Sequence, residues 1–421
     1  MGSGYRRPRF TGGAVVSSGT GYKSVSGALN SSAPLPKVPS PRLVSARCSE
    51  RARRAGARRG GEVRHLTKAA VLVGAAAVVL SACGTAADND DSDNNADEQQ
   101  QCEAVELEGD PQVALAYDVG GRGDQSFNDA AYAGLEKAQG EFGFDGTEGE
   151  ASSDESEEVR EQRLRGFADD GYNVIVGVGF AYSDSVDKVA PEYPNVSFAV
   201  IDGFDPTEDD VNCNVAYLTF AENEGSFLVG VAAAETTESD TVGFVGGVNN
   251  PLIQKFEAGF KAGVEETNPD IEVVSTYIEE SDPRGFGDPA GGQAAAEGLI
   301  NDGADVIFHA AGASGIGVFD AVTSADLWAI GVDSDQYLTA SPEQQPHILT
   351  SMLKRVDVST YDFIAAAFDG EPLSGYTEFT LADDGVDYST SGDFLSGDLI
   401  TEIDDYKQQI IDGDLEVPTE P

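Results

Sequence analysis

Aspartates and glycines recur where apolar, strand-length runs of this chain end. The positions are Asp118, Gly179, Asp202, Gly246, Gly312 and Asp333. In parallel sheets ligands bind off the carboxyl ends of the strands. Glycine leaves the backbone open to a ligand there, and aspartate accepts hydrogen bonds from hydroxyl groups or ring N–H groups. The pattern predicts a site that holds a polar small molecule.

Side chains for common catalytic chemistry are scarce. The three histidines are His65, His309 and His347, which favours neither a histidine triad nor a zinc cluster. Neither the phosphate-binding motif G-x-x-x-x-G-K-[ST] nor the nucleophile motif G-x-S-x-G occurs. Gly312 opens a glycine cluster that could suit a dinucleotide, but a lone cluster is weak evidence. We therefore expect no catalytic residue, no metal and no cofactor.

The segments that must position these residues alternate between strands and helices. Continuous apolar runs at 113–117, 174–178 and 197–201 alternate with expected helices at 126–141, 155–170 and 183–190. After a break at 219–224 the order restarts, with strands at 241–245, 271–277 and 306–308 and helices at 225–235, 252–267, 289–302 and 315–325. Apolar strands between amphipathic helices predict parallel sheets covered on both faces. The fold class expected is α/β, with two doubly wound lobes and a ligand cleft between them.

A lipoprotein export signal precedes this domain. Arg64 and Lys68 lead into an apolar run, Ala69 to Leu80, that is short for a membrane span but suits a signal-peptide core. Small residues and then Cys83 follow. We expect residues 63–82 to be removed and Cys83 to carry lipid, which would anchor the protein at the extracytoplasmic face of the cell membrane.

The segments on either side of the signal are low in apolar residues. Residues 83–110 are mostly polar and acidic, as expected for a disordered tether. Residues 1–62 are basic and lack an apolar period. We interpret them as a mis-assigned start. A basic arm that binds nucleic acid and a twin-arginine export region are the alternatives.

The part expected to be exported is strongly acidic. From Cys83 onward, 12 Lys and Arg residues stand against 72 Asp and Glu residues, a formal net charge of −60. Such a surface stays hydrated at high ionic strength, so we expect a salt-adapted host. Without a basic patch, binding to nucleic acids or nucleotides is disfavoured.

The four cysteines can each be assigned a place. Cys48 lies in the basic segment and Cys83 takes the lipid, which leaves Cys102 and Cys213 in the exported domain. Outside the cytoplasm such a pair can oxidise. A bridge would close a loop of about 110 residues and stabilise the fold by ~4 kcal/mol in the chain-entropy model. Two free thiols are the alternative.

A glycine-rich turn after the first strand carries a family resemblance. It reads Gly-Gly-Arg-Gly-Asp-Gln-Ser-Phe-Asn over 120–128, and matching blocks follow in order at 177–180, 222–230, 256–263, 311–317, 331–336 and 350–355. Together they cover about residues 113–369. The chain resembles the basic membrane protein family of substrate-binding lipoproteins, nucleoside receptors that feed ABC importers. The resemblance implies a type I periplasmic-binding-protein fold.

The resemblance also implies a purine nucleoside site. Aromatic rings would enclose the base, and polar side chains would bind the base edge and the ribose. The expected ligand-binding residues are Asp118, Phe127, Asn128, Asp202, Phe286, Gly312, Asp333 and Lys354. Phe127 would stack on one base face, and Phe286 is the weaker candidate for the other. Asp118 and Asn128 would address the base edge, with Asp202 near them. Asp333 and Lys354 would hold the ribose hydroxyls.

Simpler interpretations of these residues stay open. Phe127 could serve only as a hydrophobic staple at the start of its helix, and the aspartates could be turn or cap residues. Arg122 departs from the family pattern, where an acidic or small residue is common, and this leaves the base preference open.

We expect a lipid-anchored monomer that captures inosine, guanosine or adenosine and delivers it to ABC permease subunits. The first lobe would span about residues 111–221 with a returning segment at about 350–375. The second would span about 222–349 and part of the C-terminus. An exported enzyme acting on nucleosides, a signal-sensing lipoprotein and a sugar receptor are the alternatives.

Overall fold

The computed structural model describes residues 105–152, 155–204 and 212–421. The basic segment, the expected signal peptide, Cys83, Cys102 and most of the expected tether lie outside these ranges. Within them, no helix is both long enough and apolar enough to cross a membrane.

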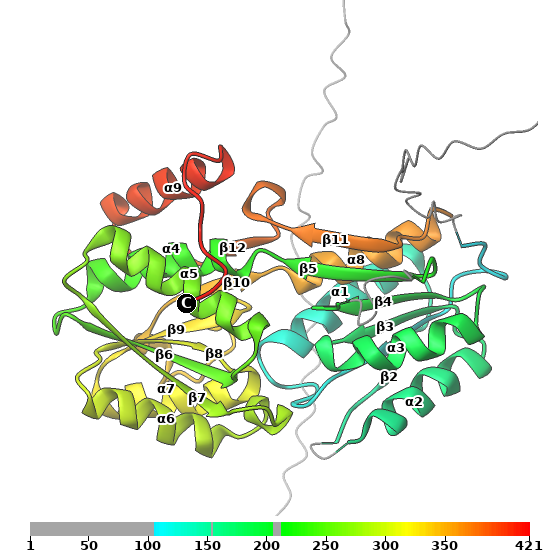
Figure 1. Cartoon of the computed structure of the whole chain (residues 1–421), viewed down its shortest axis with the longest axis horizontal. Helices are drawn as coiled ribbons and strands as arrows, with labels where there is room; N and C mark the ends of the chain where they lie inside the picture. The colour runs from blue at the N-terminus through cyan, green and yellow to red at the C-terminus, as the bar shows by residue number, and fades with distance from the viewer. Residues whose placement is uncertain (1–104, 153–154, 205–211) are drawn as a thin grey trace, which may run out of the picture. The chain divides into compact units, whose positions relative to one another are not determined.

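The first lobe is built on a six-stranded sheet in the order β11-β5-β4-β3-β1-β2 (Figure 1). All its strand pairs are parallel. The strands are β1 (Val113–Ala116), β2 (Thr147–Gly149), β3 (Val174–Val178), β4 (Ser197–Ile201), β5 (Val215–Phe220) and β11 (Gly375–Phe379). The helices of this lobe are α1 (Phe127–Phe142), α2 (Glu157–Asp169), α3 (Ser183–Val189) and α8 (Val356–Phe368). The central strands are completely buried, as their continuous apolar sequences predict.

The second lobe repeats this arrangement in the order β12-β10-β9-β8-β6-β7. Its strands are β6 (Thr241–Val248), β7 (Glu272–Glu279), β8 (Val306–Ala310), β9 (Trp328–Asp333), β10 (Ile348–Lys354) and β12 (Val386–Tyr388). Its helices are α4 (Glu222–Thr236), α5 (Pro251–Thr267), α6 (Pro289–Asn301), α7 (Gly315–Ala325) and α9 (Gly397–Ile411). Only β12 runs antiparallel to its neighbour, β10. The sheet is therefore parallel except at one edge.

The chain passes between the lobes after β5, after β10 and again between β11 and β12. The second passage differs from the sequence-based boundary at about residue 350. Because β10 pairs with β9 as far as Leu353, the chain returns to the first lobe only at Arg355. Lys354, at the end of β10, therefore belongs to the second lobe.

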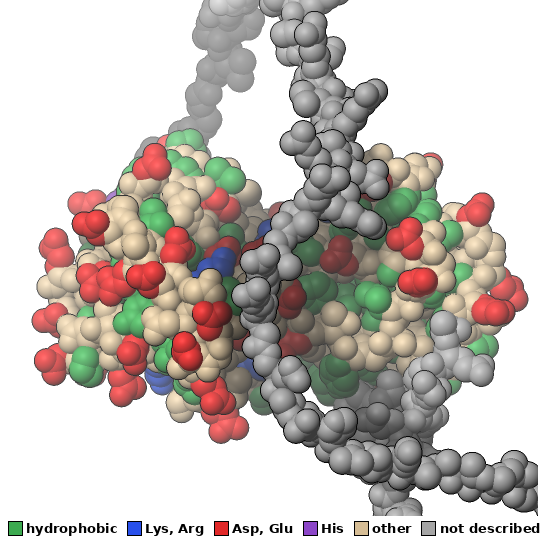
Figure 2. Space-filling view, turned by 90° about the horizontal axis from the view of Figure 1, so that it is seen from above, with side chains coloured by type: hydrophobic (Ala, Val, Ile, Leu, Met, Phe, Trp, Pro, Cys, Tyr) green, Lys and Arg blue, Asp and Glu red, His purple; other side chains and the backbone are tan. Residues whose placement is uncertain are grey.

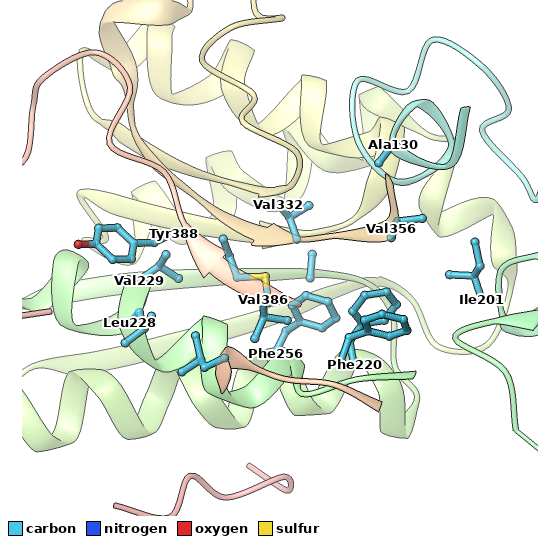
Figure 3. Packing of buried hydrophobic residues seen from close by; sticks show 14 of the residues in the cluster. Ala130, Ile201, Phe220, Leu228, Val229, Phe256, Val332, Val356, Val386 and Tyr388 are labelled. Atoms are coloured by element: carbon cyan, nitrogen blue, oxygen red, sulfur yellow. The ribbon is translucent and has the colours of Figure 1, made fainter. Parts of the chain in front are cut away.

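One buried apolar cluster includes side chains from both lobes. Around the passages Phe220 of β5, Phe256 of α5, Val332 of β9 and Val386 of β12 belong to it (Figure 3). The shared packing fixes the strand ends of the two sheets close to each other.

The surface of the domain is acidic. Figure 2 shows Asp and Glu side chains over the visible faces of both lobes, with few Lys or Arg side chains among them. This distribution agrees with the charge expected from the sequence.

Candidate functional site

A cavity of about 570 Å³, including the part open to solvent, lies between the two sheets. Residues of both lobes line it. Its walls contain all eight residues that the sequence nominates, namely Asp118, Phe127, Asn128, Asp202, Phe286, Gly312, Asp333 and Lys354. Other residues also line the cavity that were not predicted from the sequence to bind the ligand, among them Asp124, Phe180, Leu252 and Phe256.

The three aspartates at strand ends come from β1, β4 and β9. Asp202 and Asp333 adopt left-handed backbone conformations, with φ of 59° and 63°. Aspartate tolerates this region better than most residues. The conformation ends each strand sharply and leaves the carboxylate at the sheet edge, where the cavity begins.

Asp118 keeps its place because the neighbouring strand ends in glycine. Gly179, after β3, has φ of 112°, and a Cβ atom there would lie 2.7 Å from Asp118 Oδ2. Asp118 Oδ1 accepts a hydrogen bond of 2.7 Å from the Val119 N–H. Only glycine at 179 satisfies both the backbone conformation and the space that the carboxylate needs.

Lys354 joins the lobes through buried ion pairs. Its Nζ lies 2.7 Å from Asp202 of the first lobe and 3.1 Å from Glu222 of the second. The same ammonium lies 5.0–5.4 Å from the ring centroids of Phe127, Phe220 and Phe256. Since only 2% of the Lys354 side chain is exposed, these partners replace its hydration.

A second contact between the lobes lies beside Asp333. Ser126 Oγ of the first lobe donates to Asp333 Oδ2 over 2.5 Å. Ser334 Oγ donates to the Ser126 carbonyl over 3.1 Å, and Gln336 Nε2 donates to the Gln125 carbonyl over 3.0 Å. The turn before α1 is thus docked on the end of β9, beside the cavity.

Aromatic rings from both lobes face the cavity. Phe127 opens α1 in the first lobe, and Phe286 ends a short 3₁₀ helix, Pro283–Phe286, in the second. Phe180 meets Phe286 edge to face with ring centroids 6.3 Å apart. A Cβ atom at Gly247 would come within 2.5 Å of the Phe286 ring, so glycine there leaves room for it. Flat apolar walls of this kind suit a planar ring system.

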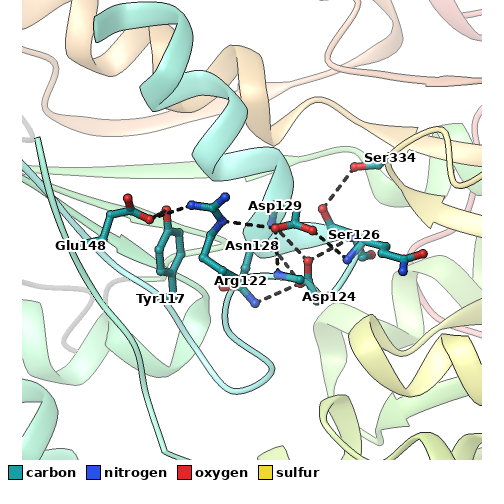
Figure 4. A network of polar contacts seen from close by, with 10 residues as sticks. Tyr117, Arg122, Asp124, Ser126, Asn128, Asp129, Glu148 and Ser334 are labelled. Atoms are coloured by element: carbon teal, nitrogen blue, oxygen red, sulfur yellow. Dashed lines mark hydrogen bonds and ion pairs between the residues drawn. The ribbon is translucent and has the colours of Figure 1, made fainter. Parts of the chain in front are cut away.

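Arg122 does not line the cavity. Its guanidinium pairs with Asp129 at 3.3 Å and Glu148 at 2.9 Å (Figure 4). It also lies 3.2 Å from the ring centroid of Tyr132. Arg122, the residue that departs from the family pattern, therefore does not contact the site directly.

Burial raises the pKa of each strand-end carboxyl. The pKa is about 6 for Asp118, about 6 for Asp202 and about 7 for Asp333. The positive charge of Lys354 acts against burial at Asp202 and Asp333. Burial lowers the pKa of Lys354 as well, but the surrounding carboxylates outweigh it and the pKa is raised overall. Above neutral pH the cavity thus holds more negative than positive charge.

Cys213, one half of the expected bridge, does not line this cavity. Cys213 is disulfide-bonded. Cys102 lies outside the described residues, so its pairing with Cys213 stays a prediction. Over the described part of the chain, no group of three or more His, Cys, Asp or Glu side chains is arranged to hold a metal ion.

Comparisons with known proteins agree with this geometry. The family model for PnrA-like ABC transporter substrate-binding proteins matches residues 112–420. The chain belongs to this family. It is 36% identical to the CD4+ T-cell-stimulating antigen of Listeria innocua, with 82% of this chain and 96% of the relative covered. It is 29% identical to the ABC transporter nucleoside-binding protein BmpA of Lactococcus lactis, with 74% and 90% covered.

Solved structures place the fold in the same class. A solute-binding protein of an ABC transporter system from Aeropyrum pernix superposes with a TM-score of 0.64 at 30% identity, covering 73% of this chain and 93% of that one. The expected family and the type I periplasmic-binding-protein fold are therefore confirmed. Members of this family bind substrates for ABC transporters.

Proposed function

We propose that this protein captures a purine nucleoside in the cavity between its lobes and delivers it to an ABC importer. In this proposal Phe127 and Phe286 enclose the base, and Asp118 and Asn128 meet its edge. Asp333 and Lys354 bind the ribose, and Gly312 brings backbone close to the ligand. Lipidation at Cys83 would hold the domain at the outer face of the cell membrane, next to the permease.

The observation that carries the proposal is the combination of flat apolar walls with strand-end carboxylates in one cavity. Aromatic side chains stack on any base. A carboxylate such as Asp333 can accept both hydrogen bonds of a vicinal diol. One relative is named a nucleoside-binding protein, which supports the same ligand class.

The charge of the cavity favours a neutral nucleoside over a nucleotide. Asp118, Asp202 and Asp333 all line it, and Lys354 already pairs with Asp202 and Glu222. A phosphate group would add two negative charges to this set without a free cation among the lining residues that the structure describes. Uncharged ligands avoid that penalty.

Isothermal titration calorimetry of the domain at pH 8 and high salt tests the proposal. We expect inosine, guanosine or adenosine to bind, while ribose, free bases and nucleoside monophosphates bind at least tenfold more weakly. Phe127→Ala should weaken nucleoside binding by about 1–3 kcal/mol. Phe142→Ala, which removes a ring stacked on Phe368 away from the cavity, is the matched control. Ribose binding as tightly as the nucleosides would instead support a sugar receptor.

A further inference from the structure

The turn before α1 contains a buried carboxylate whose acceptor sites are all used inside the protein. Asp124 Oδ1 accepts from the N–H groups of Ser126 at 3.0 Å and Asp129 at 3.1 Å. Asp124 Oδ2 accepts from the backbone N–H of Asn128 at 2.8 Å and from its side-chain Nδ2 at 3.0 Å. An ionised carboxyl offers about four acceptor positions. Asp124 lines the cavity but has no further position to offer a ligand.

This arrangement fixes the orientation of the Asn128 amide. A carboxylate can only accept hydrogen bonds, so the amide nitrogen must point toward Asp124 (Figure 4). The amide oxygen, Oδ1, is then turned away from Asp124. It is buried and has no hydrogen-bond partner. A buried polar atom without a partner calls for an explanation, and a ligand atom that donates to it is one.

Two acceptor groups of the first lobe therefore line the wall of the cavity. Asn128 Oδ1 is one, and the Asp118 carboxylate at the end of β1 is the other. Burial raises the pKa of Asp118 to about 6, so above pH 7 it is an acceptor. Burial also raises the pKa of Asp124, whereas its three backbone N–H donors stabilise the carboxylate.

Purine bases differ in what they bring to such a wall. At the edge remote from the ribose, guanine carries N1–H and a 2-amino group, which are adjacent donors. Hypoxanthine has N1–H alone. Adenine has the 6-amino donor next to N1, whose lone pair would face a carboxylate. A base that brings no donor to Asp118 forgoes a charge-assisted hydrogen bond. It also leaves buried acceptor atoms of the wall without a partner.

We infer that this wall selects a guanine nucleoside, and that Asp124 is the positioning residue that sets the selection by holding the Asn128 oxygen toward the ligand. The inference rests on the proposed function and narrows it to one base. Guanosine should bind best, inosine next and adenosine least.

Calorimetry at pH 8 with guanosine, inosine and adenosine tests this order. In the wild-type protein we expect guanosine to bind at least tenfold more tightly than adenosine, with inosine between them. Asp124→Asn lets the Asn128 amide rotate and should reduce the guanosine-to-adenosine ratio to about threefold or less. Asn128→Ala should lower guanosine affinity about tenfold and adenosine affinity less. The exchange variant D124N/N128D keeps a donor facing an acceptor and should regain part of the ratio.

Asp129→Asn is the matched control, because Asp129 accepts backbone N–H groups in the same turn but bonds to Arg122 instead of Asn128. It should leave the ratio unchanged. If Asp124 were only a helix cap, Asp124→Asn would weaken all three nucleosides by one factor, and this would overturn the inference. Should Asp124→Asn fail to fold, Asn128→Ala decides alone. Tight binding of adenosine to the wild type contradicts the inference but leaves the proposed function standing, whereas no binding of any nucleoside contradicts the proposed function.

Discussion

At the scale of single residues, the strand-end carboxylates are held where they weaken the fold. Asp333 is 7% exposed and its pKa is raised to about 7. A carboxyl whose pKa is higher in the folded state binds its proton more tightly there than in the unfolded chain. The contribution of Asp333 to stability is therefore greatest below its unfolded pKa near 4 and is lost as the pH rises to 7. Above pH 7 the loss is on the order of 4 kcal/mol.

Asp333→Asn should therefore stabilise the ligand-free domain at pH 8 while it weakens nucleoside binding. The neutral amide has no charge to desolvate, and its oxygen can still accept from Ser126 Oγ. We expect a gain of about 1–4 kcal/mol in the free energy of unfolding at pH 8, shrinking toward pH 5. Urea unfolding at both pH values measures it.

Asp405→Asn on α9 serves as the control, because this aspartate is exposed to solvent. It should change stability by less than about 0.5 kcal/mol at either pH. A variant at Asp333 that is less stable than the wild type at pH 8 would mean that the carboxylate supports the fold.

The eight site residues could be predicted from the sequence as candidates, because each lies at a strand end or within a recognisable motif. The part played by Asp124 could not be predicted, although it lies in the quoted motif. Its hydrogen bonds to three N–H groups and one amide depend on how the turn folds. Phe180 lines the cavity from a short 3₁₀ helix, Phe180–Tyr182. No periodic pattern of apolar residues predicts how such a short helix is oriented.

At the scale of elements, the position of the Asp118 carboxylate depends on the turn that follows the neighbouring strand β3. Gly179→Ala should remove nucleoside binding, because the new methyl group would lie only 2.7 Å from Asp118 Oδ2 and would push the carboxylate out of place. The positive φ of 112° adds a backbone cost of about 1–3 kcal/mol. Calorimetry and thermal unfolding of the variant measure the two effects separately.

Gly171→Ala isolates the backbone effect. Gly171 has φ of 94° and no atom within 4 Å of the position of a Cβ. It should lose similar stability but keep its affinity for nucleosides. Equal affinity in the two variants would show that the space beside Asp118 is not needed for binding.

The alternating strands and helices were largely predictable, since buried parallel strands have continuous apolar sequences. The edge strands β2, β11 and β12 were not predicted. The sequence of β2, Thr-Glu-Gly, has no apolar side chain to mark it. The helix expected from residue 225 begins at Glu222. Glu222 is completely buried and pairs with Lys354 and Lys255, and these long-range partners cannot be seen in the local sequence.

At the scale of the whole domain, the cavity exists because two lobes meet over it. The contacts of Lys354 with Asp202 and of Ser126 with Asp333 both join the lobes and both use residues proposed to bind the ligand or adjacent to them. Ligand binding and lobe closure would thus be coupled through the same side chains. A permease could then distinguish the loaded protein from the empty one by its shape.

The acidic surface is consistent with the proposed salt-adapted host, since screening by salt reduces repulsion among exposed carboxylates. It also disfavours anionic ligands at a distance, before they reach the cavity. The charge of the surface and the charge of the cavity therefore both favour a neutral nucleoside.

A crystal structure of the domain grown with guanosine at pH 8 tests the central claim most directly. The account predicts the base between Phe127 and Phe286, with N1–H and the 2-amino group toward Asp118 and Asn128. It predicts the ribose hydroxyls within hydrogen-bond distance of Asp333 and Lys354. Guanosine bound elsewhere, or bound in this cavity with its ribose toward Asp118, would contradict the account.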